Sequence, residues 1–136
     1  MLFRSEGVWD KSKTVVFALD VLSLGELRFL DPEGEVVSYP VPPWLRETLL
    51  DVAASEPRFS SVRAFSPSVG ATDAGPFLAC GWDAVALTCI DPALGAARHY
   101  HQHSDTPENL DIEQVLLSID FAEALGRRVM VDRGRG

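Results

Sequence analysis

The stretch TVVFALDVL, residues 14–22, indicates the fold class of this chain. It is β-branched, aromatic and almost entirely apolar, which is typical of a strand covered on both faces in a sheet flanked by helices. Asp20 interrupts the run, and a carboxylate there is costly to bury unless it is paired, hydrogen-bonded or bound to a metal. Because ligands of α/β proteins gather at the carboxyl ends of strands, Asp20 is either a functional ligand or a strand-end residue hydrogen-bonded in a turn.

The segments around this strand predict further strands. Residues 27–31 (LRFLD) predict a second strand, and the PEG turn at 32–34 leads into residues 35–40, so we expect a hairpin. Residues 61–65 predict a short strand, and residues 83–90 predict a longer apolar one. Strands that alternate with helical patterns favour an α/β layered domain with a mixed sheet.

Three segments predict helices. After Pro42 and Pro43, apolar residues at helical spacing predict a helix over residues 44–55. A brief helix follows Thr72 or Asp73 as its N-cap and stops at Gly81. The last helix starts after Asp111, with Gln114 three residues later to close a capping box, and ends at Gly126 or the arginine pair 127–128.

The bulk composition narrows the class of protein. With 136 residues, 46% of them hydrophobic, the chain predicts one domain over residues 1–126 followed by a flexible basic tail over 127–136. The net charge of −8 argues against a nucleic-acid partner. No signal peptide or membrane span is recognisable, so we expect a cytoplasmic protein as sequenced. Cys80 and Cys89 lie among apolar neighbours and favour free, buried thiols.

The segment HYHQHSDTPENLD, residues 99–111, raises the question of a metal site. On an extended chain His99, His101 and His103 would face one side. Imidazole is a common zinc ligand, and Asp105 is a natural partner to orient one. No fourth ligand has the spacing of a closed structural site, so from spacing alone a polar loop rich in histidine is the favoured interpretation and a metal site is the alternative. Other catalytic motifs, such as GxSxG, HExxH or a glycine-rich phosphate loop, are not found in the sequence.

Three segments together resemble the M28 family of zinc-dependent aminopeptidases and carboxypeptidases. VVFALDVLSLGELRF (15–29) looks like its strand that ends in a metal-binding Asp. ATDAGPFLACGWDAVAL (71–87) is similar to its S-D-x-x-P-F segment, and YHQHSDTPENLDIEQV (100–115) is similar to its H-x-x-x-D-T-x-E-N-x-D loop. The resemblance covers residues 14–125 and implies the C-terminal half of a three-layer α/β/α zinc-exopeptidase domain, a phosphorylase/hydrolase-like fold with a mixed β-sheet.

The resemblance also implies roles for single residues. Asp20 matches the aspartate ligand of one zinc, and His101 matches the histidine ligand of the other. His99 and His103 match no ligand and are expected at the rim of the pocket. Two further residues, Asp105 and Thr106, match the turn of the loop, and Asp73 matches an aspartate with an orienting or structural role.

The family's remaining apparatus has no counterpart here. Its earlier His, bridging Asp and Glu-Glu pair, which includes the general base, precede the Asp20 motif, and Glu6 does not replace them. We therefore expect no catalytic residue in this chain, weak zinc binding at most, and peptide hydrolysis only if the site is completed. An uncovered sheet edge favours self-association or pairing with a missing N-terminal half. The alternatives are a non-catalytic binding or assembly module, or a subunit completed by a partner chain.

Overall fold

The computed structural model describes residues 9–68 and 70–134. Its centre is a four-stranded sheet in the order β1-β4-β2-β3. β1 and β4 are parallel, β2 and β3 are parallel, and β2 and β4 are antiparallel, so the sheet is mixed as the sequence predicts. The strands are β1 (Val15–Leu19), β2 (Glu26–Leu30), β3 (Arg63–Phe65) and β4 (Asp83–Ile90).

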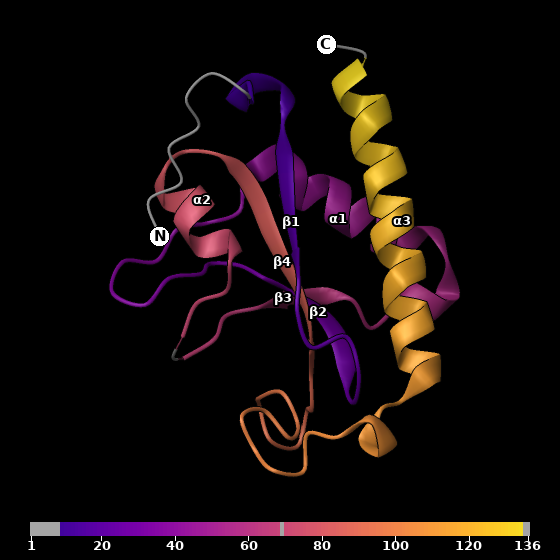
Figure 1. The fold of residues 1–136 in the computed structure, drawn as a ribbon. Coiled ribbons are helices and arrows are strands. Elements are labelled where there is room, and N and C mark those ends of the chain that lie inside the picture. The colour runs from indigo at the N-terminus through magenta and orange to yellow at the C-terminus, as the bar shows by residue number, and fades with distance from the viewer. Residues whose placement is uncertain (1–8, 69, 135–136) are drawn as a thin grey trace.

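Helices cover the two faces of this sheet. The α-helices are α1 (Pro43–Ser55), α2 (Ala74–Ala79) and α3 (Ile112–Gly134), and the 3-10 turns are η1 (Lys11–Lys13), η2 (Pro57–Phe59) and η3 (Pro107–Asn109). α1 and α3 pack on one face and α2 packs on the other, which gives the expected three layers (Figure 1). None of the helices in the described ranges is long and apolar enough to cross a membrane.

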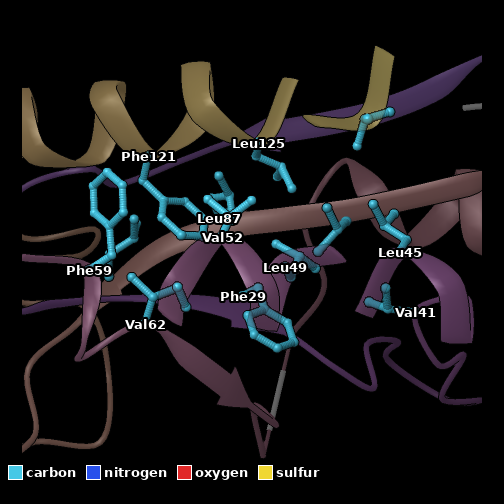
Figure 2. Packing of buried hydrophobic residues seen from close by; sticks show 14 of the residues in the cluster. Phe29, Val41, Leu45, Leu49, Val52, Phe59, Val62, Leu87, Phe121 and Leu125 are labelled. Carbon is cyan, nitrogen blue, oxygen red and sulfur yellow. The ribbon is translucent and has the colours of Figure 1, made fainter. Parts of the chain in front are cut away.

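The main core lies between the sheet and helices α1 and α3 (Figure 2). Val85, Leu87 and Cys89 alternate along β4 toward this side, and all are completely buried. Phe59 and Phe121 meet there edge to face, with ring centroids 5.2 Å apart, a favourable aromatic geometry. The other face of β4 carries Ala84 and Ala86 against the short α2, a smaller second core. The α1 stripe predicted from spacing is buried as expected: Leu45, Thr48, Leu49, Val52 and Ala53.

The start of α3 confirms one half of the predicted capping box. The carboxylate of Asp111 accepts a hydrogen bond from the backbone N–H of Gln114 at 3.1 Å. The reciprocal half is different, because the N–H of Asp111 donates to Ser23 Oγ at 2.7 Å. The Gln114 side chain instead donates to Ser118 Oγ at 3.2 Å. The cap therefore ties the helix start to the loop that follows β1.

The predicted hairpin is wrong. Residues 35–40 form no strand, and an isolated antiparallel bridge joins Tyr39 to Glu33 in the preceding turn. The turn is instead drawn inward by its carboxylates, since Asp31 Oδ1 accepts from the N–H of Val41 at 2.9 Å and Glu33 is buried against Thr72. Side-chain hydrogen bonds thus replace the ladder that a second strand would supply.

The predicted end of the last helix is also wrong, because α3 continues past Gly126 and the arginine pair to Gly134. Gly126 packs directly against β1, where a Cβ would lie 4.0 Å from the ring of Phe17. Beyond it, Val129 is buried in the core. Arg133 pairs with Asp83 and donates to the carbonyl of Ser12. Tertiary contacts therefore keep the chain helical beyond Gly126, although a glycine by itself favours the end of a helix.

Candidate metal-binding loops at the carboxyl end of the sheet

Two loops meet at one end of the sheet. β1 and β4 are parallel neighbours, with Leu19 opposite Leu87, so the segments that follow them leave the same end. β2 begins there too, with Glu26 opposite Ile90. Residues 20–25 form one loop and residues 91–111 form the other, which Figure 1 shows in orange below β4. In α/β sheets this carboxyl end is where ligands bind.

Asp20 lies at the first position of the loop after β1. Its backbone N–H donates to the carbonyl of Leu87 at 3.1 Å, which fixes its place at the strand end. Its side chain is exposed, and no hydrogen bond or ion pair of its carboxylate occurs within residues 9–68 and 70–134. Val21 follows with φ of 51°, a strained conformation for a β-branched residue. The carboxylate is thus presented to solvent by a strained turn.

The histidine segment adopts turns rather than an extended chain. His99 and His101 have φ of 61° and 55°, in the left-handed region. His99 is half-buried, and its Nδ1 is 2.7 Å from Ser104 Oγ. His101 is exposed, and its ring stacks on Tyr100 with centroids 3.9 Å apart. Its nitrogens make no hydrogen bond in the part of the chain that the structure describes. His103 is exposed as well. Of the three, His99 is therefore held by the loop itself.

The second half of the loop is a self-contained turn. The N–H of Asp105 donates to the carbonyl of Gln102, and the N–H of Thr106 donates to that of Ser104, both at 3.0 Å. The Glu108 carboxylate accepts from its own N–H and from the Thr106 hydroxyl, which together hold the pKa of Glu108 below its ordinary value. Asp105 and Thr106 thus occupy a tight turn before η3.

Buried hydroxyls join the two loops to each other and to the core. Ser23, in the first loop, is buried and accepts from the N–H of Asp111 at the end of the second. Ser118 on α3 is fully buried and lies 3.3 Å from the carbonyl of Leu22. The loops that carry Asp20 and His101 are therefore tied together at their bases, although the described ranges hold no group of three or more His, Cys, Asp or Glu side chains arranged for a metal.

Asp73 lies apart from these loops, at the N-cap of α2 after β3. Its carboxylate makes no capping hydrogen bond. Thr72 does this instead, since its Oγ accepts from the N–H of Ala74 at 3.2 Å. The N–H and hydroxyl of Thr72 both donate to Glu33, a completely buried carboxylate that sequence reasoning assigned only to a turn. Its second oxygen, Oε2, has no hydrogen-bond partner within the described ranges. No pattern in the sequence signals that this acid is buried.

The cysteines differ from each other. Both are free, as predicted, but Cys80 is exposed and only Cys89 is buried. Cys80 ends α2, where the carbonyl accepts a 2.7 Å hydrogen bond from Lys11 and the side chain faces outward. Burial raises the pKa of the Cys89 thiol, and its hydrogen bond to Ser118 opposes this in part. Neither thiol therefore extends the candidate site.

The sequence matches no protein-family model and no curated protein. Among solved structures, the chain is similar to BSAP, a zinc aminopeptidase from Bacillus subtilis, with a TM-score of 0.69 and 21% sequence identity. The match covers 85% of this chain but 28% of the aminopeptidase chain. This chain thus has the fold of one part of a zinc aminopeptidase: a mixed sheet with helices on both faces.

Proposed function

We propose that this chain is part of a metal-dependent exopeptidase of the M28 type, in which Asp20 holds one zinc and His101 holds the other. The observation that carries the proposal is the meeting of the two loops at the carboxyl end of β1 and β4. Support comes from the fold shared with a zinc aminopeptidase, whose chain is more than three times as long as the segment matched here.

The donor chemistry of the two residues suits zinc, but the described residues do not complete a site. The carboxylate of Asp20 and the imidazole of His101 are both exposed and free of hydrogen bonds within the described ranges. Catalytic zinc has three protein ligands and an open position. A single Asp or His falls short of this, so no step of peptide hydrolysis follows from these side chains alone. We accordingly propose that the chain binds zinc weakly and is inactive until further ligands and a general base are supplied.

Zinc titration followed by NMR tests the ligand assignment. We expect Zn²⁺ to shift the ring signals of His101, and His101→Gln to abolish the tightest binding step. Asp20→Asn should weaken a separate step, because the two residues serve different ions. The matched control is His103→Gln, an exposed neighbour in the same loop, which should leave the titration unchanged. Equal loss in the His101 and His103 variants would contradict the assignment and indicate unspecific binding by a histidine-rich loop.

Hydrolysis of an aminoacyl-anilide tests the second part of the proposal. The purified chain with excess zinc should show no turnover above that of zinc alone. Turnover that a chelator abolishes and that Asp20→Asn lowers would show that this chain holds a complete active site, contrary to the proposal.

A further inference from the structure

The outer side of α3 carries apolar residues that the fold does not cover. Ile112, Leu116, Ile119 and Met130 are 60%, 55%, 47% and 69% exposed, although the opposite side of the same helix fills the core. A surface helix normally shows one apolar stripe and a polar remainder. A second apolar stripe on one helix is therefore a mark of an interaction surface.

This outer stripe lies above the edge of β1. Ile112, Ile119, Gly126 and Arg133 are spaced seven residues apart, so they share one side of the helix and drift by only about 20° per step. Gly126 faces β1, since a Cβ placed on it would lie 4.0 Å from the ring of Phe17, and Arg133 pairs with Asp83 at the start of β4. The apolar residues of this row therefore overhang β1 on the side away from the core.

The edge of β1 beneath the stripe is open. β4 pairs with one side of β1, and no strand within residues 9–68 and 70–134 pairs with the other. The N–H of Asp20 points to β4, where it donates to Leu87. Backbone groups alternate along a strand, so the N–H groups of Val15, Phe17 and Leu19 point to the open edge. Leu19 is 50% exposed there. An apolar edge of five residues is a template for another strand.

We propose that this surface binds a second copy of the chain. In the dimer, the two β1 strands pair antiparallel across a two-fold axis and join the two four-stranded sheets into one. The two α3 helices, which run antiparallel to β1 in each copy, then pack antiparallel to each other above the junction (Figure 1).

The charges around the edge are complementary to themselves in this arrangement. β1 is flanked by Lys13 before it and Asp20 after it, so antiparallel pairing centred on Phe17 brings the basic end of one strand beside the acidic end of the other. On α3, Glu123 and Arg127 are centred one residue before Gly126. Antiparallel helices centred at that point place Glu123 of each copy beside Arg127 of the other. Like charges do not face each other in the pair of β1 strands or in the pair of α3 helices.

A single two-fold axis can relate both the two β1 strands and the two α3 helices. The middle of β1 is Phe17, and the middle of the charged pair on α3 lies next to Gly126, which faces the ring of Phe17. Ile119 and Met130 lie nearly symmetrically on either side of that point, so each Ile119 meets the partner copy's Met130 across the axis. This geometry uses no metal ligand, but it occupies the sheet edge at which a missing N-terminal half would pair, so the dimer is the state of the chain without that half.

The mass of the pure chain in solution, measured by light scattering during gel filtration, tests the dimer. We expect twice the chain mass of 14.9 kDa. Leu19→Pro removes an N–H that points to the open edge and leaves the bonds to β4 intact, so it should give a folded monomer. Glu123→Arg should also dissociate the dimer, and the exchanged pair Glu123→Arg with Arg127→Glu should restore it. Circular dichroism checks that each variant is folded.

Two controls separate this surface from general stickiness and from the metal site. Leu50→Glu, on an exposed apolar residue of α1, should leave the mass doubled. His101→Gln should do so too, because the candidate metal ligand takes no part in the interface. A wild-type chain that stays at 14.9 kDa at every concentration would overturn the proposal. So would loss of the dimer in Leu50→Glu, or failure of the exchanged pair to restore it.

Discussion

The inner and outer sides of α3 both carry apolar residues, but in opposite environments. Phe121 and Leu125 on the inner side are completely buried against α1 and β4, whereas Ile119 and Met130 on the outer side are largely exposed. The two rows lie on different sides of one helix, and the outer one is interrupted by Glu123 and Arg127. Apolar periodicity thus predicts that a helix forms and packs, but the number of its apolar rows indicates how many partners it needs. Among the described residues of this chain, one row is covered by the fold and the other is not.

The two cysteines give the largest contrast between covered and open positions. Cys89 faces the inner side of α3, with its Sγ 3.6 Å from Ser118 Oγ, while Cys80 is exposed. A thiol reagent should label Cys80 at the rate of a free thiol. It should reach Cys89 only through opening of the core, which costs up to the full free energy of unfolding, typically about 5–15 kcal/mol. Mass spectrometry of peptides after timed labelling measures both rates.

The pH dependence of this contrast has a definite sign. Because burial raises the folded-state pKa of Cys89, its thiol favours the folded state most strongly below the unfolded pKa. The contribution falls as the pH rises past that value, so alkaline pH should lower the free energy of unfolding, and Cys89→Ala should remove this part of the decline. Equal labelling rates for the two cysteines in native buffer would show that the inner side of α3 is not covered.

Phe121→Ala should lower the free energy of unfolding by about 3–5 kcal/mol, because it leaves a cavity between α3, β4 and η2. Its ring is completely buried and packs edge to face on Phe59. The matched change on the outer side is Leu116→Ala, 55% exposed. In the Leu19→Pro background, where assembly makes no contribution, it should cost no more than about 0.5 kcal/mol. Urea denaturation followed by circular dichroism gives both values. Similar losses of unfolding free energy in the two variants would contradict the difference between a covered inner row and an open outer row.

Ser118→Ala should cost about 1 kcal/mol, a smaller effect on the same inner side. The fully buried hydroxyl lies 2.8 Å from the carbonyl of Gln114 and 3.3 Å from that of Leu22, so it links α3 to the loop that carries Asp20. The control is Ser60→Ala at an exposed position, which should have no measurable effect. Hydrogen exchange should show faster opening of residues 20–25 in the Ser118 variant alone. A uniform increase over the whole chain would instead indicate global destabilisation.

Much of the fold could be predicted from the sequence. An apolar run such as residues 83–90, and the helical spacing of apolar residues in α1, directly indicate which side chains are buried. The predictions were wrong where contacts of side chains with distant parts of the chain outweighed the local sequence pattern. Residues 35–40 look like a strand, but buried Asp31 and Glu33 hold the turn in another conformation. Gly126 looks like a helix stop, yet it lies mid-helix because the residues after it are held by tertiary contacts, with Val129 in the core and Arg133 paired with Asp83.

The candidate site could be predicted only in part. The sequence places Asp20 and His101 after strands, and the parallel pairing of β1 and β4 brings their loops to one end of the sheet. Their metal roles stay predictions. The bonds that tie these loops together, from Ser23 to Asp111 and from Ser118 to Leu22, join residues far apart in the chain. Such pairs leave no local pattern, since each is an ordinary serine in sequence.

The smallest effect is expected for Glu123→Gln on the outer side of α3. The Arg127 guanidinium donates to Glu123 at 2.9 Å and 2.7 Å, but the Arg127 side chain is 73% exposed and that of Glu123 is 58% exposed. In the monomeric Leu19→Pro background, losing this i,i+4 pair should cost about 0.3–0.5 kcal/mol, and added salt should reduce the cost further. Thermal denaturation at low and high salt measures this. A much larger cost in the monomer would mean that Glu123 stabilises α3 itself, so that dissociation by Glu123→Arg could then reflect a weakened helix. A small cost leaves the charge between the two copies as the reason for that dissociation.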